Sequence, residues 1–298
     1  MAARAASKDA ALVVVIPTDG SPERARAAYR EAAAKALVVV GPLTRGEVSA
    51  LLGETLPVPT LVLNLPETLA GAAGTSTRAR PLPAQMRALA LSIEHEAGSA
   101  ARAVYRPETG VAVVVTTGSA LHKRAAAAFS AAWTQLGGSI AETVEFSGSL
   151  ARVRQSIERA RAATVFLAAD AAGARLLRPY LGRNTTVIAT SQVYGGPPAS
   201  DAKKFHDLNG IRFVDMPWLH QADRAAFGFA QPDAPLAPDL DRLYALGIDA
   251  YRVALEMMRG RAAFDLDGVT GRLRVGVGVI EREPIQAEYR DGEVSAIK

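Results

Sequence analysis

The stretch VAVVVTTGSALHKRAAAAFSAAWTQLGG, residues 111–138, decides the fold class of this chain. It begins with an unbroken β-branched run, turns at Gly118, and continues as an Ala-rich segment that ends at Gly137. A continuous Val run is typical of a strand that is buried on both faces of a parallel sheet. A glycine after a helical pattern is a helix stop signal. The stretch therefore predicts a buried strand followed directly by a helix.

The same strand–helix order recurs on both sides of this stretch. We expect strands at residues 12–17, 37–42, 59–66, 111–119, 139–147, 164–170, 185–191 and 210–217. We expect helices at residues 21–36, 43–54, 84–103, 120–138, 149–163, 171–182 and 240–260, and a β-rich tail at 268–290. A polar, Pro-rich passage at residues 71–83 separates two such series. The order predicts an α/β protein with two doubly wound parallel-sheet lobes and an inter-lobe cleft.

Length, charge and cysteine content limit the classes of protein to which this chain can belong. The chain has 298 residues, which is enough for two core-bearing domains of about 100–150 residues each. Its net charge of +4 is mildly basic. The sequence contains no Lys/Arg cluster with interleaved aromatic residues, so a nucleic-acid partner is not expected. The absence of cysteine excludes thiol chemistry and disulfides. The sequence contains no run of about 18 apolar residues, so we expect no membrane-spanning helix. The first residues do not have the pattern of a signal peptide.

Motifs for catalysis and cofactor binding are missing from the sequence. There is no G-x-G-x-x-G, no Walker A motif and no G-x-S-x-G. None of the four histidines has a second one at a helical spacing, so a metal site is not expected. His95 stands between Glu94 and Glu96, a pattern that we interpret as a solvated helix. We predict no catalytic residue, no metal and no cofactor, and we interpret the chain as a protein without enzymatic activity.

The stretch DLNGIRFVDMPWLHQ, residues 207–221, permits two interpretations. A turn at Asn209-Gly210 leads into a short apolar strand, which ends in Asp215, Met216, Pro217 and Trp218. Ligands of open α/β sheets bind outside the carboxyl ends of the strands, so these residues are candidates for the mouth of a cleft. A large aromatic residue after a proline is equally typical of a packed corner.

Several blocks of sequence together carry a family resemblance. They are ALVVVGPLTRGEVSAL (36–51), PVPTLVLNLPE (57–67), LALSIEHEA (89–97), VYGGPP (193–198), DLNGIRFVDMPWL (207–219), LYALGIDAYRV (243–253) and DLDGVTGRLRV (265–275). In this order they resemble the LppC family of outer-membrane lipoproteins, the penicillin-binding protein activators, from about residue 13 to about residue 290. The resemblance implies a fold like that of type I periplasmic binding proteins. Lobe one is then residues 1–105 plus 234–266, and lobe two is residues 106–233 plus 267–298.

The resemblance also implies a set of candidate cleft residues. In the amino-acid receptors of this fold, Ser/Thr hydroxyls and helix N-termini meet the ligand's carboxylate, and an acid meets its ammonium group. The matching loops here, with the strand end at 215–218, hold Thr44, Asn64, Thr68, Gly118, Ser119, Asp170, Ser191, Gln192, Asp215 and Trp218. Gln192 stands where the acid is expected, which leaves Asp170 as its substitute. Hydroxyls at these turns are also ordinary helix N-caps.

Two functions remain as alternatives. The resemblance implies a non-catalytic regulator that binds and activates a bifunctional penicillin-binding protein at the periplasmic face of the outer membrane. The fold alone would also suit a periplasmic solute-binding receptor for an amino acid or a similar small molecule, and the cleft is a candidate site for such a molecule or for a peptidoglycan fragment.

Two departures from the family pattern qualify these expectations. The first strand–helix unit of a type I lobe is missing or reduced to residues 1–12, so we expect an exposed or differently covered edge in the first sheet. The lipidated cysteine and the signal peptide of the family are not in this sequence. Membrane contact is therefore expected only through an anchor that this chain does not contain.

Overall fold

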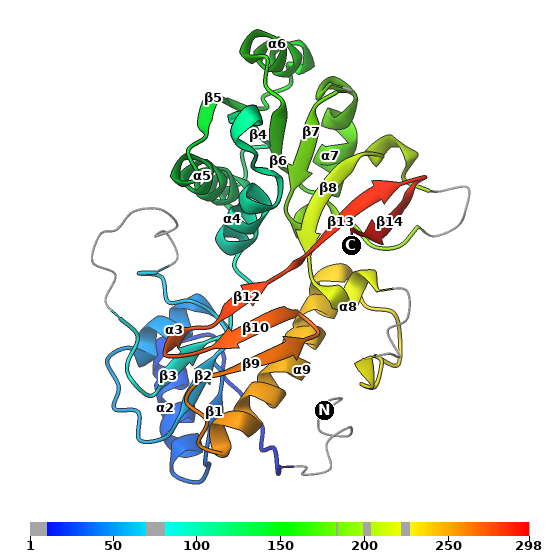
Figure 1. Cartoon of the computed structure of the whole chain (residues 1–298). Helices are drawn as coiled ribbons and strands as arrows, with labels where there is room; N and C mark the ends of the chain where they lie inside the picture. Colours follow the sequence, from blue (N-terminus) through cyan, green and yellow to red (C-terminus); the bar gives the residue numbers. More distant parts are fainter. Residues whose placement is uncertain (1–10, 70–80, 183, 199–203, 222–226, 298) are drawn as a thin grey trace. The chain divides into compact units, whose positions relative to one another are not determined.

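The computed structural model describes residues 11–69, 81–182, 184–198, 204–221 and 227–297. The chain divides into two compact units. Unit 1 consists of Met1–Ala72, Ser76–Ser92 and Asp223–Glu283, and unit 2 of Ala73–Thr75, Ile93–Ala222 and Pro284–Lys298. Each unit contains a sheet of parallel strands with helices on its faces (Figure 1), so the predicted α/β fold class is confirmed.

Unit 1 is built on a four-stranded parallel sheet. Its strand order is β1 (Val39–Val40), β2 (Thr60–Val62), β3 (Met86–Ala88) and β11 (Gly278–Val279). Helices α2 (Pro22–Ala33) and α3 (Arg45–Leu51) cover one face and share a core with Val62 and Met86. The other face carries α9 (Pro238–Met258), against which Leu61 and Leu89 pack. Strands β9 (Phe264–Gly268), β10 (Gly271–Val275) and β12 (Glu281–Glu283) form a small antiparallel sheet on that side.

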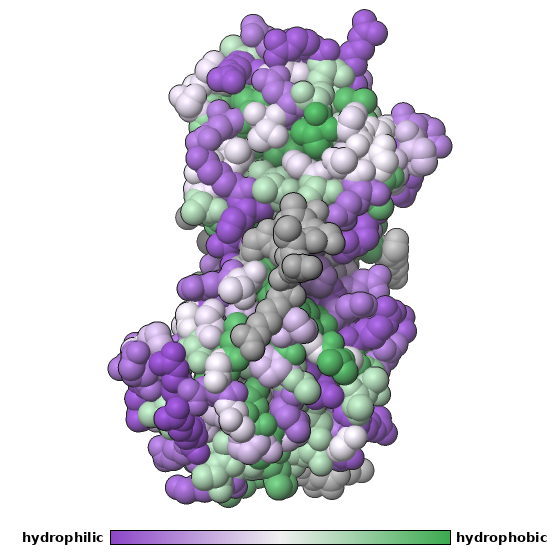
Figure 2. Space-filling view, turned by 90° about the vertical axis from the view of Figure 1, so that its left-hand side faces the viewer, coloured by the Kyte–Doolittle hydropathy of each residue, from purple (hydrophilic) through white to green (hydrophobic). Residues whose placement is uncertain are grey.

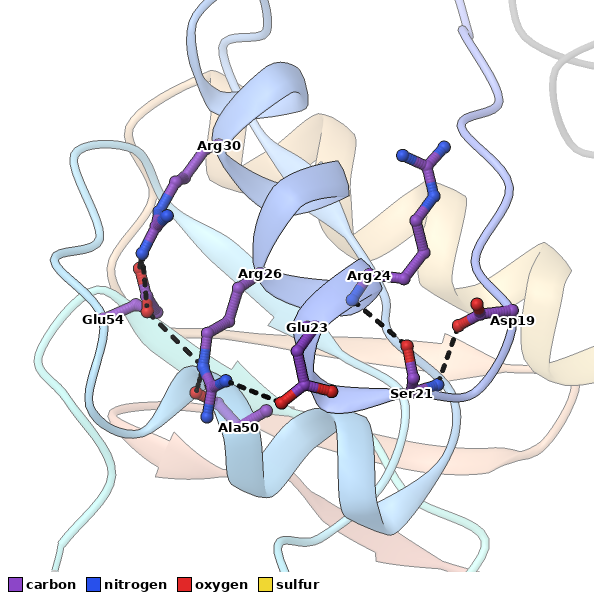
Figure 3. Close-up of polar contacts among 8 residues, drawn as sticks. All are labelled: Asp19, Ser21, Glu23, Arg24, Arg26, Arg30, Ala50 and Glu54. Atoms are coloured by element: carbon purple, nitrogen blue, oxygen red, sulfur yellow. Dashed lines mark hydrogen bonds and ion pairs between the residues drawn. The ribbon is translucent and has the colours of Figure 1, made fainter.

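Helix α2 begins where the sequence predicts it. Ser21 is its N-cap, and the Ser21 hydroxyl accepts a hydrogen bond from the Arg24 N–H at 3.2 Å. Figure 3 shows that Arg30 reaches from this helix to Glu54, with nitrogen–oxygen distances of 2.8 and 3.0 Å. Exposed ion pairs of this kind contribute only about 0–1 kcal/mol. The helix is therefore held mainly by its buried face, on which the Tyr29 hydroxyl also meets Thr60 at 3.0 Å.

Unit 2 is built on a seven-stranded sheet. The strand order is β14 (Glu293–Ala296), β13 (Ile285–Arg290), β8 (Ile211–Asp215), β7 (Thr186–Ala189), β6 (Thr164–Ala168), β4 (Val111–Thr116) and β5 (Ser139–Glu145). The five strands from β8 to β5 are parallel, and β13 and β14 add antiparallel strands at the edge.

The helices of unit 2 cover both faces of this sheet (Figure 1). Helices α4 (Ile93–Val104) and α5 (Ala120–Gln135) pack on one face, where Phe129 stacks on Phe166 with ring centroids 4.2 Å apart. Helices α6 (Leu150–Ala160) and α7 (Ala171–Leu177) pack on the other face through residues such as Ile157 and Leu177. Helices can pack on both faces because the continuous apolar strands present valine side chains to both.

Two predicted elements are wrong. Residues 12–17 do not form a strand, because residues 11–19 pair with no strand within the described ranges. The helix expected at 84–103 is instead β3 followed by α4. Residues Met86–Ala88 have good helix propensity, but the parallel pairing of β3 with β2 overrides it. The Pro-rich passage at 71–83 lies largely outside the described residues.

The predicted lobes and the observed units differ at their boundaries. Helix α4 belongs to unit 2, whereas the predicted lobe one extends to residue 105. Strands β10, β11 and β12 belong to unit 1, whereas the predicted lobe two includes residues from 267 onward. The sequence break at the prolines precedes the change of unit, which comes between Ser92 and Ile93.

Candidate functional site

Seven of the ten candidate residues follow strands of the sheet in unit 2. Strands β8, β7, β6 and β4 are neighbours and run parallel, so their carboxyl ends lie at one edge. The residues at this edge are Gly118 and Ser119 after β4, Asp170 after β6, Ser191 and Gln192 after β7, and Asp215 and Trp218 at the end of β8. The fold therefore brings this set to the edge where ligands bind in open α/β sheets.

The other three candidates lie in unit 1. Thr44 follows β1 and Asn64 follows β2, so both stand at the carboxyl edge of the parallel sheet in that unit. Thr68 lies farther along the chain, in an exposed turn. The use of all ten residues by one ligand remains a prediction.

Ser119 and Asp170 are helix caps. The Ser119 hydroxyl accepts a hydrogen bond from the His122 N–H at 3.1 Å at the start of α5. A carboxylate oxygen of Asp170 accepts one from the Gly173 N–H at 2.7 Å at the start of α7. Both side chains thus satisfy backbone donors that a helix leaves open at its first turn.

Thr44 and Asn64 likewise bond to the protein itself. Thr44 caps α3: its hydroxyl accepts from the Glu47 N–H at 3.4 Å and donates to Glu47 Oε2 at 2.7 Å. Burial disfavours ionisation of Glu47, but hydrogen bonds from Thr18 and Thr44 hold the pKa of its carboxyl below the usual value. The Asn64 amide donates to the Leu43 carbonyl at 2.9 Å and so ties two loops together.

The sequence analysis missed two buried carboxylates on α4, Glu94 and Glu96. We expected the helix around His95 to be solvated, and this prediction is wrong for the two glutamates beside His95. Glu94 is 8% exposed and Glu96 is 5% exposed. Glu96 Oε2 accepts a hydrogen bond from the Ser191 N–H at 3.1 Å, and Glu94 pairs with Arg124 at 2.8 Å. The sequence contains a weak signal for this, because small residues follow both glutamates one turn later and allow close packing.

A second group missed by the sequence analysis surrounds His122. The Nδ1 atom of His122 lies 2.6 Å from the Thr117 hydroxyl. Burial lowers the pKa of His122, and the negative charge of Asp170 partly opposes this shift. Neutral imidazole is therefore the favoured form near neutral pH. Asp170 supplies the negative charge of this group.

Asp215 and Trp218 have the geometry of a packed corner. One carboxylate oxygen of Asp215 accepts from the Met216 N–H at 2.8 Å, and the other lies 2.8 Å from Nε2 of His220. The side chains of Asp215 and His220 are each 1% exposed. The His220 ring meets Tyr194 edge-on at 4.6 Å. The Trp218 side chain is fully buried, so neither predicted residue presents a free polar atom to solvent.

Metal-binding and membrane-spanning features are absent from the part of the chain that the structure describes. No three His, Asp or Glu side chains there are grouped closely enough to hold a metal ion. No helix there has the length and the apolar composition that crossing a bilayer requires.

Comparison with known proteins identifies the family. The family described as "LppC putative lipoprotein" matches residues 1–160 and 148–292. The chain belongs to this family. The predicted resemblance is thereby confirmed, and the LppC-family chain has the type of fold that the resemblance implied.

Curated relatives of this LppC-family chain are longer than the chain itself. The "Penicillin-binding protein activator LpoA" of Enterobacter sp. (strain 638) is 26% identical over an alignment of 308 positions, gaps included, which covers 87% of this chain and 41% of the relative. The protein of the same name from Haemophilus influenzae is 25% identical over 264 residues, covering 86% and 44%. The chain thus spans less than half the length of these relatives.

Solved structures agree on the fold. A "putative branched-chain amino acid ABC transporter" from Chromobacterium violaceum is 33% identical, with a TM-score of 0.72, and the match covers 92% of this chain and 86% of that one. The C-domain of LpoA from Haemophilus influenzae, described as "a regulator of PBP1A", is 22% identical, with a TM-score of 0.69 and coverage of 93% and 86%. The predicted periplasmic-binding-protein-like fold is confirmed.

Proposed function

We propose that this LppC-family chain is a non-catalytic regulator of peptidoglycan synthesis that binds and activates a bifunctional penicillin-binding protein. The observation that carries the proposal is the family match along the chain, together with relatives named as penicillin-binding protein activators that align with 86–87% of it. The location proposed with it is the periplasmic face of the outer membrane, which suits a family described as lipoproteins.

The hydrogen bonds at the carboxyl edge of unit 2 argue against a tightly bound anionic ligand there. An anionic ligand at this edge would need backbone donors at the starts of the helices. The N–H groups of His122, Gly173 and Ser191 already donate to side chains of the protein. A ligand would have to displace these internal bonds, which leaves its net gain small.

The mixed hydropathy of the surface is compatible with reversible protein contact. Hydrophilic and hydrophobic residues both reach the surface of each unit on the face drawn in Figure 2. Non-obligate interfaces are about as apolar as the rest of a protein surface, so such a face suits reversible contact with a synthase. An interface of standard size would bury about 1,200–2,000 Å² in total.

Reconstitution with the cognate synthase tests the proposal. Transpeptidase crosslinking of nascent peptidoglycan by the purified bifunctional penicillin-binding protein is measured with and without this chain. We expect the crosslinked fraction to rise saturably with the concentration of the chain. The control is Asp170→Asn, which keeps the N-cap of α7 but removes its charge. This variant should activate equally well, because contact between protein surfaces does not depend on a ligand at Asp170.

A solute-binding receptor is the second candidate. The 33% identity to the transporter protein of Chromobacterium violaceum favours it, and Asp170 supplies an acid at the expected edge. Calorimetry with leucine, isoleucine, valine and muropeptides measures this function directly. Micromolar binding that Asp170→Asn abolishes, combined with no effect on the synthase, would replace the regulatory proposal. No binding together with stimulated crosslinking would reject the receptor.

A further inference from the structure

The small antiparallel sheet of unit 1 has one face that is entirely charged. Strands β9, β10 and β12 lie side by side in this sheet, with β10 in the centre (Figure 1). Leu266 and Leu273 point inward and join the core formed with α9. Because successive side chains of a strand point to opposite sides, the residues between them face outward. We name the outward residues, all of which are exposed, the charged face: Asp265, Asp267, Arg272, Arg274, Glu281 and Glu283.

The strand register arranges the charged face in two rows. Arg272 lies directly opposite Asp267 of β9 and Glu283 of β12. Two residues along β10, Arg274 lies opposite an acid of each outer strand in the same way. Neighbouring strands are about 4.8 Å apart, and side chains on one face recur at about 7 Å along a strand. The pattern is therefore a fixed array in which each arginine stands between two carboxylates.

The ion pairs within the charged face leave two of its carboxylates unpaired. Arg272 pairs diagonally with Asp265 at 3.2 Å, and Arg274 pairs with the acid of β12 opposite it at 2.8 Å. Asp267 and Glu283 form no ion pair with any residue that the structure describes, although Arg272 is the residue opposite both. Four acids and two arginines give the charged face a net charge of −2. Since the whole chain carries +4, the rest of it carries +6.

Charge decides which kind of partner fits the charged face. A negative surface attracts a surface that presents lysine and arginine residues and repels an acidic one. The same face of a second copy would bring negative charge against negative charge, so reciprocal pairing of two copies is disfavoured. Permanent cover by an apolar segment is disfavoured too, because it would strip water from six charged side chains. A reversible contact with a basic protein surface satisfies all three conditions.

We propose that the charged face docks a surface of the penicillin-binding protein that is rich in lysine and arginine. The proposal rests on the regulatory function proposed above and names the surface through which the chain reaches the synthase. Basic residues of the synthase pair with Asp267 and Glu283, the two carboxylates that lack an ion pair within the described residues. Paired strands hold the six side chains at fixed spacings, so the face selects its partner by the pattern of charge as well as by its sign.

Binding of the full chain to the purified, immobilised synthase tests the proposal by surface plasmon resonance. We expect Asp267→Lys/Glu283→Lys to weaken binding about tenfold or more, because the new lysines repel the basic residues of the partner. The neutral variant Asp267→Asn/Glu283→Gln should weaken binding less, and added salt should affect it less than the unmodified chain. The matched control is Glu31→Lys/Glu108→Lys, which makes the same change in net charge at exposed acids outside the charged face. This control should bind within about twofold of the unmodified chain.

The outcomes separate the docking face from the regulatory function. Thermal unfolding verifies that the variants, which alter exposed positions, remain folded. If the unmodified chain binds and activates the synthase and all variants bind equally well, the charged face is overturned and the regulatory function stands. Equal weakening by the control would also overturn the face, because net charge rather than this surface would then govern binding. A chain that neither binds nor activates the synthase would reject both proposals. Sedimentation of the unmodified chain as a dimer that Asp267→Lys/Glu283→Lys dissociates would overturn the proposal by assigning the face to a second copy.

Discussion

His122 shows how a single residue links the stability of unit 2 to pH. Burial holds the pKa of His122 below its ordinary value of 6.5. Below pH 6.5 the unfolded chain therefore takes up a proton that folded His122 does not, and folding loses free energy as the pH falls through the folded pKa. We expect the free energy of unfolding to decrease as the pH falls below 6.5, and to decrease less in His122→Gln. Urea unfolding across this pH range measures the free energy of unfolding of the unmodified chain and of His122→Gln.

Asp170→Asn provides the control at this site. Asparagine caps helices as well as aspartate does, so α7 should keep its start. The charge of Asp170 raises the pKa of His122, so its removal should lower that pKa further. NMR titration of the imidazole resonances measures the shift. An unchanged or higher pKa in the variant would contradict the role given to Asp170.

At the scale of elements, one buried carboxylate fastens the β9–β10 hairpin to α9. Asp249 accepts hydrogen bonds from the Val269 N–H at 3.1 Å, the Thr270 N–H at 2.8 Å and the Thr270 hydroxyl at 2.7 Å. Asp249→Ala would leave these donors buried without an acceptor. We expect the free energy of unfolding to fall by about 3 kcal/mol, measured by chemical denaturation.

Asp265→Asn is the matched control on the same hairpin. Asp265 pairs with Arg272 at 3.2 Å, but both side chains are at least half exposed. Removal of such a pair should change the free energy of unfolding by less than about 1 kcal/mol. Equal losses in Asp249→Ala and Asp265→Asn would show that the buried carboxylate does not fasten the hairpin.

At the scale of the whole molecule, unit 2 depends on the last residues of the chain. Strand β13 pairs antiparallel with β8, and it places Ala287 and Tyr289 in the core of unit 2. The Tyr289 hydroxyl also donates to the Val193 carbonyl at 3.1 Å. A chain that stops after Glu283 lacks these contacts, so we expect unit 2 to lose its cooperative unfolding.

Tryptophan fluorescence measures this effect selectively. The chain has two tryptophans, and both Trp133 and Trp218 lie buried in unit 2. A chain that stops after Gly292 is the control, because it loses only β14, whose side chains are mostly exposed. It should retain a cooperative transition at a modestly lower temperature. A cooperative transition in the shorter chain as well would contradict the requirement for β13.

Most helices and strands could be predicted from the sequence because the patterns that specify them are local. The valine run at residues 111–116 and the Ser-Pro-Glu start at residue 21 correspond to β4 and to the start of α2. Periodicity and capping act between residues a few positions apart, so they act before any tertiary contact forms. The roles of Ser119 and Thr44 as helix N-caps could be predicted for the same reason, and both residues cap their helices.

The rest depended on partners that are distant in sequence. Residues 12–17 have the composition of a strand, but a strand exists only where another edge pairs with it. Glu94 and Glu96 look solvated in sequence, and they are buried because Arg124 and Ser191 approach them from other elements. The sequence by itself thus determined the order and type of most elements and the family. The tertiary structure alone decided which apolar segments pair as strands within the described residues and which charged groups are buried, because both depend on contacts that form only when distant segments pack together.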